Sequence, residues 1–140
     1  MAEIILDGNE PVRFYIEMGV AIYPRIQGVS ESWAYEISGK ALAAEHERLH
    51  KMIKNQGLKD LLEYFVPSQE DAEEFGASVE ENWYEPNEGI AIIDAMTAVA
   101  DTHPAGIGRS EELKTDLQAF RLILERAKAE GKMWNLAMDY

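Results

Sequence analysis

Three residues in one short stretch of the chain have the types and spacing needed to hold a metal ion. His46, Glu47 and His50 fit the pattern H-E-x-x-H, and the surrounding periodicity predicts a helix. Histidines four residues apart lie on the same side of a helix, where both imidazoles can face one Zn²⁺. A glutamate directly after the first histidine is placed to activate a metal-bound water as a general base. The spacing therefore predicts His46 and His50 as ligands and Glu47 as the base of one candidate hydrolytic site.

This stretch resembles the zinc-binding motif of the zincin metallopeptidases, and the resemblance covers these five residues alone. It implies zinc as the cofactor and hydrolysis of a peptide or amide as the reaction. Two neighbouring cations, Arg48 and Lys51, raise the energy of a bound dication. A catalytic zinc also needs a third protein ligand, and no second motif identifies one. Candidate ligands farther along the chain include Glu70, Asp71, Glu73, Glu74 and His103, none of which belongs to a recognisable second motif.

The same helix also predicts a packing role for the first histidine. On a helical wheel His46 falls among Leu42, Leu49 and Ile53, inside the apolar stripe, and His50 lies at the edge of that stripe. A histidine in this position is more often a hydrogen-bonded core residue than a metal ligand. The packing interpretation is therefore favoured, and it implies no cofactor.

The second informative feature is a strongly acidic segment. Between Lys59 and Arg109 the chain has twelve Asp and Glu residues and no Lys or Arg, whereas the rest holds 14 acidic and 13 basic residues. The net charge of −13 therefore comes almost entirely from this segment. Such a chain is not expected to bind a nucleic-acid backbone, which requires clustered Lys and Arg.

The middle of this segment, residues 70–88, combines acidic and aromatic side chains. Carboxylates there steer a cationic surface towards the protein, and aromatic side chains that become buried hold it in place. The pattern therefore predicts a binding face for a basic protein partner. The alternative is a solvated loop and helix face, with Trp83 and Tyr84 folded into the core. The residues assigned to partner binding are Glu70, Asp71, Glu73, Glu74, Glu80, Glu81, Trp83, Tyr84 and Glu85.

Composition narrows the remaining classes of function. The chain has 140 residues, of which 46% are hydrophobic, enough for a single globular domain over residues 1–140. It has no cysteine, which excludes thiol catalysis, disulfides and cysteine-ligated metal sites. Neither a secretory signal nor a membrane span is predicted, so we expect a cytoplasmic protein that does not bind membranes.

The periodicity of apolar residues predicts strands at both ends of the chain and helices between them. The fold class expected from this order is α+β, with a small, mostly antiparallel sheet packed against three to four helices. The C-terminal strand is expected to direct Trp134, Leu136 and Met138 to the core and the residues between them to the other face. The predicted strands are residues 12–18, 20–23 with its end at Pro24, 33–37 and 134–140, and the predicted helices are residues 40–56, 58–65, 90–100 and 110–131.

Together these patterns favour a non-catalytic binding protein whose acidic and aromatic face engages a basic protein. It is similar, as a class, to small acidic immunity proteins and inhibitors, which occupy basic clefts. One alternative is a small zinc metallohydrolase that uses His46, Glu47 and His50. Another is an oligomeric structural or regulatory domain, with Trp83 or Trp134 buried between chains.

Overall fold

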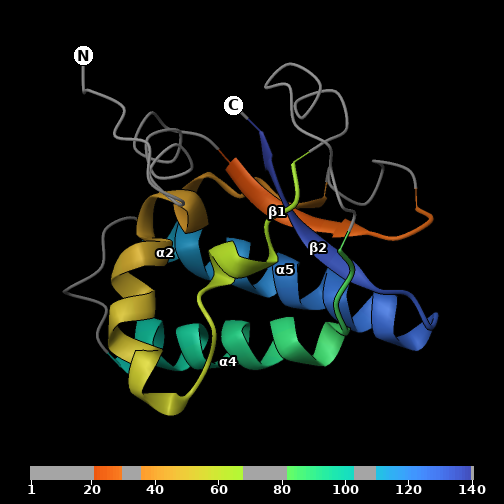
Figure 1. The fold of residues 1–140 in the computed structure, drawn as a ribbon. Coiled ribbons are helices and arrows are strands. Elements are labelled where there is room, and N and C mark those ends of the chain that lie inside the picture. Colours follow the sequence, from red (N-terminus) through yellow and green to blue (C-terminus); the bar gives the residue numbers. More distant parts are fainter. Residues whose placement is uncertain (1–20, 30–35, 68–81, 103–109, 140) are drawn as a thin grey trace, which may run out of the picture.

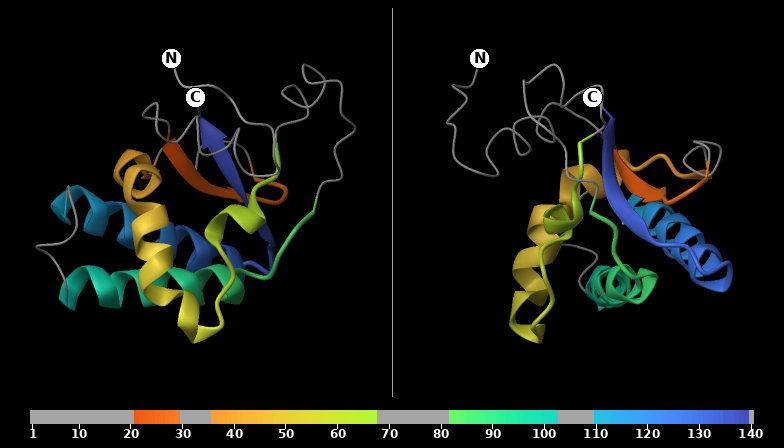
Figure 2. Two further views of the ribbon diagram at one scale, coloured as in Figure 1. Left: turned by 60° about the vertical axis from the view of Figure 1, so that its left-hand side comes forward. Right: turned by 45° about the vertical axis from the view of Figure 1, so that its right-hand side comes forward.

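A computed structural model describes residues 21–29, 36–67, 82–102 and 110–139 of the chain. In this described part, three α-helices pack against one side of a two-stranded antiparallel sheet (Figure 1). The arrangement confirms the predicted α+β class. Helices α4 and α5 run antiparallel to each other beneath the sheet, and α2 packs across both of them (Figure 2). The elements are β1 (Ala21–Ile26), α2 (Lys40–Ile53), η2 (Lys54–Gln56), η3 (Leu61–Tyr64), α4 (Pro86–Thr102), α5 (Ser110–Ala129) and β2 (Trp134–Asp139).

The C-terminal strand β2 has backbone partners along both of its edges. On one edge it pairs with β1, in a register that joins Ala21 to Asp139 and Ile26 to Trp134. On the other edge the backbone N–H of Val66 donates to the Leu136 carbonyl, and Tyr84 and Trp134 exchange two backbone hydrogen bonds of 2.8 and 2.9 Å. Strand β2 is therefore the centre of the sheet, and it brings the segments around residues 66 and 84 side by side.

Strand β1 extends beyond the end predicted at Pro24, and that prediction is wrong by two residues. Pro24 lies opposite Leu136, whose carbonyl accepts from Val66 on the far edge of β2. Because hydrogen-bonding groups alternate along an antiparallel ladder, the Pro24 nitrogen faces away from β2, where the sheet needs no donor. Of the other predicted strands, residues 12–18 lie outside the described residues, and residues 36 and 37 are not in a strand.

The helices follow the predicted order with different lengths. Helix α2 and the 3-10 turn η2 together span the predicted residues 40–56, and Gly57 ends them with a φ of 76°. The predicted helix 58–65 is only the 3-10 turn η3, which starts at an Asp60–Glu63 capping box. Helix α4 begins four residues earlier than predicted, because Pro86 suits the first turn of a helix.

Trp134 is the central side chain of the core. Its ring stacks on Tyr64 at 5.0 Å between centroids and meets Phe120 edge-on at 5.8 Å. Its indole nitrogen donates to the Glu85 carbonyl at 2.9 Å. A Cβ added at Gly89 of α4 would lie 2.6 Å from the indole, so only glycine allows the helix to approach this closely. Trp134 thereby joins β2, η3, α4 and α5.

The alternation expected along β2 is only partly present. Trp134, Leu136 and Met138 are buried as predicted, but Asn135 and Ala137 are buried as well, at 0 and 1% exposure. The Asn135 side-chain amide donates to the Asn82 carbonyl at 3.1 Å. Both faces of β2 are therefore covered, whereas a period of two predicts one solvated face.

Candidate functional site

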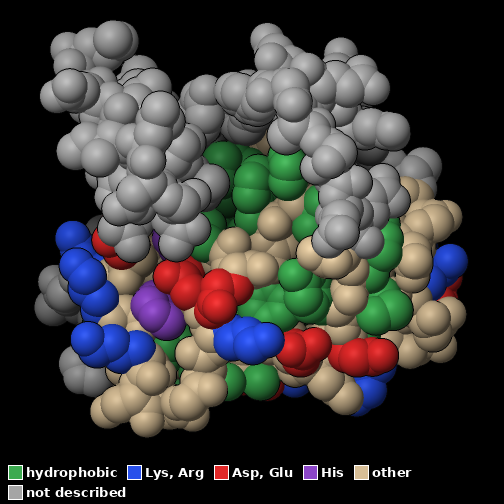
Figure 3. Space-filling model, in the orientation of Figure 1, with side chains coloured by type: hydrophobic (Ala, Val, Ile, Leu, Met, Phe, Trp, Pro, Cys, Tyr) green, Lys and Arg blue, Asp and Glu red, His purple; other side chains and the backbone are tan. Residues whose placement is uncertain are grey.

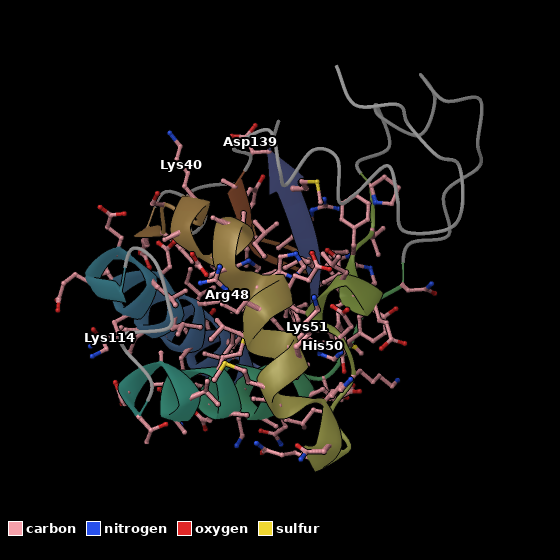
Figure 4. The ribbon with its side chains drawn as sticks, turned by 90° about the vertical axis from the view of Figure 1, so that its left-hand side faces the viewer. Lys40, Arg48, His50, Lys51, Lys114 and Asp139 are labelled. Atoms are coloured by element: carbon pink, nitrogen blue, oxygen red, sulfur yellow. The ribbon has the colours of Figure 1, made fainter. Side chains whose placement is uncertain are left out.

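Helix α2 places the residues of the H-E-x-x-H stretch in different environments. His46 is 2% exposed and lies on the core side of the helix with Leu49, whereas Glu47 is half-buried. His50 is partly exposed at the edge of the helix, and its Nε2 atom lies 3.9 Å from the Asp60 Oδ2 atom. Figure 4 views α2 from its exposed side, with His50 beside Lys51 on the side nearer η3. The first histidine is therefore enclosed and the second faces a carboxylate.

These positions do not fit a catalytic zinc within the described residues. Such a zinc needs three protein ligands and one position open to water. No group of three His, Asp or Glu side chains in the described part of the chain is arranged to hold a metal ion. The enclosed position of His46 agrees with a packing role. The zinc hypothesis remains a prediction, which the zinc content of purified, untagged protein tests directly.

The residues predicted to bind a partner are only partly within the described residues. Glu70, Asp71, Glu73, Glu74, Glu80 and Glu81 lie outside them. Tyr84 is half-buried, because its backbone pairs with Trp134 and its ring packs edge-on against Tyr64 at 4.7 Å. Trp83 is also half-buried, and Glu85 is exposed. The described part thus places an exposed carboxylate and a partly accessible tryptophan beside a tyrosine that belongs to the aromatic cluster of the core.

The fold adds three carboxylates, those of Asp60, Glu63 and Glu88, that are not among the residues assigned to partner binding from the sequence. Glu63 of η3 accepts the backbone N–H of Asp60 through its Oε2 atom at 3.0 Å, and its carbonyl accepts the Tyr84 hydroxyl at 3.5 Å. Glu88 of α4 accepts the Tyr64 hydroxyl at 3.3 Å. We name as the acidic–aromatic face the residues Asp60, Glu63, Tyr84 and Glu88, which are linked through these contacts and Tyr64, together with Trp83 and Glu85, which flank Tyr84 in the chain.

A signal for part of this face was present in the sequence. Asp60 and Glu63 have the D-x-x-E spacing of a capping box, which fixes both carboxylates at the start of a helical turn. No local pattern links Glu63 to Tyr84 or Tyr64 to Glu88, because these contacts join residues 21 and 24 positions apart. The sequence therefore indicated the charge of the face and three of its members, Trp83, Tyr84 and Glu85, but not the contacts that join them to Glu63 and Glu88.

The carboxylates of this face act on the buried Tyr64. Burial, followed by the charges of Glu88 and Glu63, raises the pKa of the Tyr64 phenol from 10.0 to about 12. Each of these effects disfavours the phenolate. The Tyr64 hydroxyl at the edge of the core is therefore held in its protonated form by burial first, and by the neighbouring carboxylates of the face second.

We predict that Tyr64 makes the protein less stable as the pH rises from about 10 to about 12. In this window the unfolded chain loses the phenolic proton while the folded chain retains it, so the free energy of unfolding falls. The expected loss is up to about 2 kcal/mol. Urea unfolding at several pH values measures it, with Tyr64→Phe as the control for other groups that titrate there. An identical pH dependence in Tyr64→Phe would contradict the prediction.

A pocket of about 360 Å³ lies at the start of α2, next to the first turns of α5. Its most buried polar group is Asp116, whose two carboxylate oxygens accept the backbone N–H groups of Gly39 and Leu42, each at 3.1 Å. This carboxylate is therefore committed to holding the start of α2. The residues lining the pocket are Ser38, Lys40, Ala41, Glu112, Thr115 and Asp116.

No protein-family model, curated protein or solved structure matches this chain. None of the helices in the described residues is long and apolar enough to cross a membrane. Any function must therefore be argued from the residues, and the acidic–aromatic face is the surface whose chemistry is most distinctive.

Proposed function

We propose that the protein is a cytoplasmic, non-catalytic binding protein that engages a basic protein partner through the acidic–aromatic face. The observation that carries this proposal is the unbroken set of contacts from Asp60 through Glu63 and Tyr84 to Tyr64 and Glu88. These contacts gather carboxylates from η3 and the start of α4 on one surface. Immunity proteins and inhibitors, as a class, occupy basic clefts with acidic surfaces of this kind.

Two carboxylates of the face, those of Glu63 and Glu88, are held in place before a partner arrives. Glu63 is fixed by its hydrogen bond to the Asp60 backbone, and Glu88 by the Tyr64 hydroxyl. Each carboxylate has further acceptor capacity for a Lys or Arg side chain of the partner. Because the side chains are already ordered, less conformational entropy is lost on binding. The face is therefore suited to specific recognition as well as to electrostatic steering.

The aromatic residues supply the non-polar part of the contact. Tyr84 is anchored by two backbone hydrogen bonds to Trp134, so the adjacent Trp83 is attached to a fixed backbone. Trp83 is half-buried, so part of this residue remains accessible. Tryptophan side chains that become fully buried at an interface often contribute most of its binding energy. Trp83 is thus expected to control dissociation, and the carboxylates to control association.

The first test uses a basic partner isolated on the immobilised protein at low salt and then purified. We expect Glu63→Lys with Glu85→Lys to lower the association rate constant about tenfold or more, since steering depends on these charges. Trp83→Ala should raise the dissociation rate constant by about tenfold or more. Both constants are measured by surface plasmon resonance at several salt concentrations.

The matched control carries the same change in charge on another face of the molecule. Glu111→Lys with Glu130→Lys alters two exposed residues, one in the first turn of α5 and one directly after its last residue. Its association rate constant should fall much less than that of the acidic–aromatic variant. If the control and the test variant fall equally, or if neither kinetic constant changes in the test variants, the proposal is wrong.

A further inference from the structure

The exposed side of α2 and η2 is basic, although the chain as a whole is strongly acidic. Lys40, Arg48, Lys51 and Lys54 are exposed along this stretch, and we name them the basic ridge. Figure 4 shows Arg48 and Lys51 along the side of α2 that faces the viewer, and Lys40 projecting from the start of the helix. In the described part of the chain, the three lysines of the ridge have no ion-pair partner, whereas Arg48 lies 3.6 Å from Glu45.

The basic ridge and the acidic–aromatic face are neighbours on the same surface. Lys51 follows His50, whose Nε2 atom lies 3.9 Å from Asp60 of the acidic–aromatic face. Lys59 directly precedes Asp60 and is exposed at this border. In Figure 3, Lys and Arg side chains gather over α2, with a histidine and carboxylates beside them. The surface therefore has a positive and a negative half that meet near His50 and Asp60.

A surface with adjacent halves of opposite charge is complementary to a second copy of itself. A two-fold axis through the border would place the ridge of each copy on the acidic–aromatic face of the other, so each favourable contact occurs twice. We infer that two copies of this chain form such an isologous dimer. This inference rests on the proposed function, since it uses the same face, and it names a second copy of the chain as a partner.

The strength of the dimer follows from the magnitudes of the charges involved. Exposed ion pairs are individually weak, and the net charge of −13 on each copy opposes association. At about 0.1 M salt the Debye length is about 10 Å, so distant charges are screened while pairs across the contact still interact. The dimer is therefore weak and reversible, and its population depends on protein concentration and salt.

A charge exchange tests the arrangement. The first variant is Lys51→Glu with Lys54→Glu, and the second is Glu63→Lys with Glu85→Lys. Each alone places like charges across both halves of the contact, so we expect the dissociation constant to rise about tenfold or more. An equimolar mixture restores opposite charges at both halves, so heterodimers should form with about the wild-type constant. Sedimentation equilibrium at about 0.1 M NaCl, with protein up to about 1 mM, measures the dissociation constants of the wild type, of each variant alone and of the mixture.

The control for the first variant is Lys128→Glu with Lys132→Glu, near the far end of α5, which should dimerise like wild type. Circular dichroism establishes that each variant is folded. Wild-type protein that stays monomeric throughout, or a mixture that shows no recovery, overturns the inference.

The proposed function is judged separately, on the purified basic partner. If the chain is monomeric but the partner binds wild type and not the second variant, the dimer is wrong and the function stands. If the chain dimerises but the second variant binds the partner as wild type does, the dimer stands and the proposed function is wrong.

Discussion

Trp134→Ala is expected to lower the free energy of unfolding by about 3–5 kcal/mol. The substitution removes a fully buried indole that stacks on Tyr64, meets Phe120 edge-on and donates to the Glu85 carbonyl. Gly89 of α4 has no side chain with which to fill the cavity. Urea unfolding followed by circular dichroism measures the loss.

Two further variants serve as comparisons for Trp134→Ala. Trp134→Phe keeps an aromatic ring but removes the hydrogen bond to Glu85, so we expect a smaller loss of about 1–3 kcal/mol. Trp83→Ala alters a half-buried tryptophan and should destabilise the protein less than Trp134→Ala. If Trp134→Ala and Trp83→Ala cost the same, Trp134 is not the centre of the core.

The elements with clear periodicity could be predicted because their burial is set by local spacing. Helix α2 and η2 end at Gly57, as predicted, since the chain needs a positive φ there and glycine adopts it without strain. Strand β2 begins at Trp134, where the helical period changes to two. In both cases a short stretch of sequence contains the whole physical cause.

The differences arise where distant segments decide the outcome. The extension of β1 through Pro24 depends on which edge of that strand faces β2, and a single strand does not contain this information. The burial of Asn135 likewise requires cover on the second face of β2. Helix 58–65 was predicted too long, because Phe65 instead forms a bridge with Leu136. Tertiary pairing therefore overrides local propensity at each of these positions.

Some features of the candidate site could be predicted from local sequence, whereas others depend on contacts between distant residues. Its net charge, both of its aromatic residues and Glu85 could be predicted from the sequence, but its shape depends on contacts of Tyr64 and Tyr84 with residues more than 20 positions away. His46 shows the opposite case. Its place in the apolar stripe of α2 predicted burial, and its exposure of 2% confirms this. A repeat every three or four residues indicates which side of a helix is buried, but it does not indicate which surfaces meet.

The residue that holds the start of α2 lies 74 and 77 positions away from the two amides it binds, on helix α5. Gly39, the residue before α2, has no side chain to cap the helix, and its φ of 76° places it in the left-handed region. A Cβ there would lie 2.2 Å from the Ile22 carbonyl oxygen, so a capping serine or aspartate cannot replace it. The buried Asp116 performs this role by accepting the N–H groups of Gly39 and Leu42.

We predict that Asp116→Ala lowers the free energy of unfolding by about 2–4 kcal/mol, because it leaves two backbone donors without their acceptors. Asp116→Asn retains one acceptor oxygen, so its loss should be about half as large. The neighbouring Thr115→Ala, at an exposed position of the same turn, should change stability by about 0.5 kcal/mol or less. Urea unfolding measures the three values, and hydrogen exchange at Gly39 and Leu42 reports whether α2 loosens at its start. Unchanged exchange at both amides in Asp116→Ala would show that α2 is held by packing of its apolar side alone.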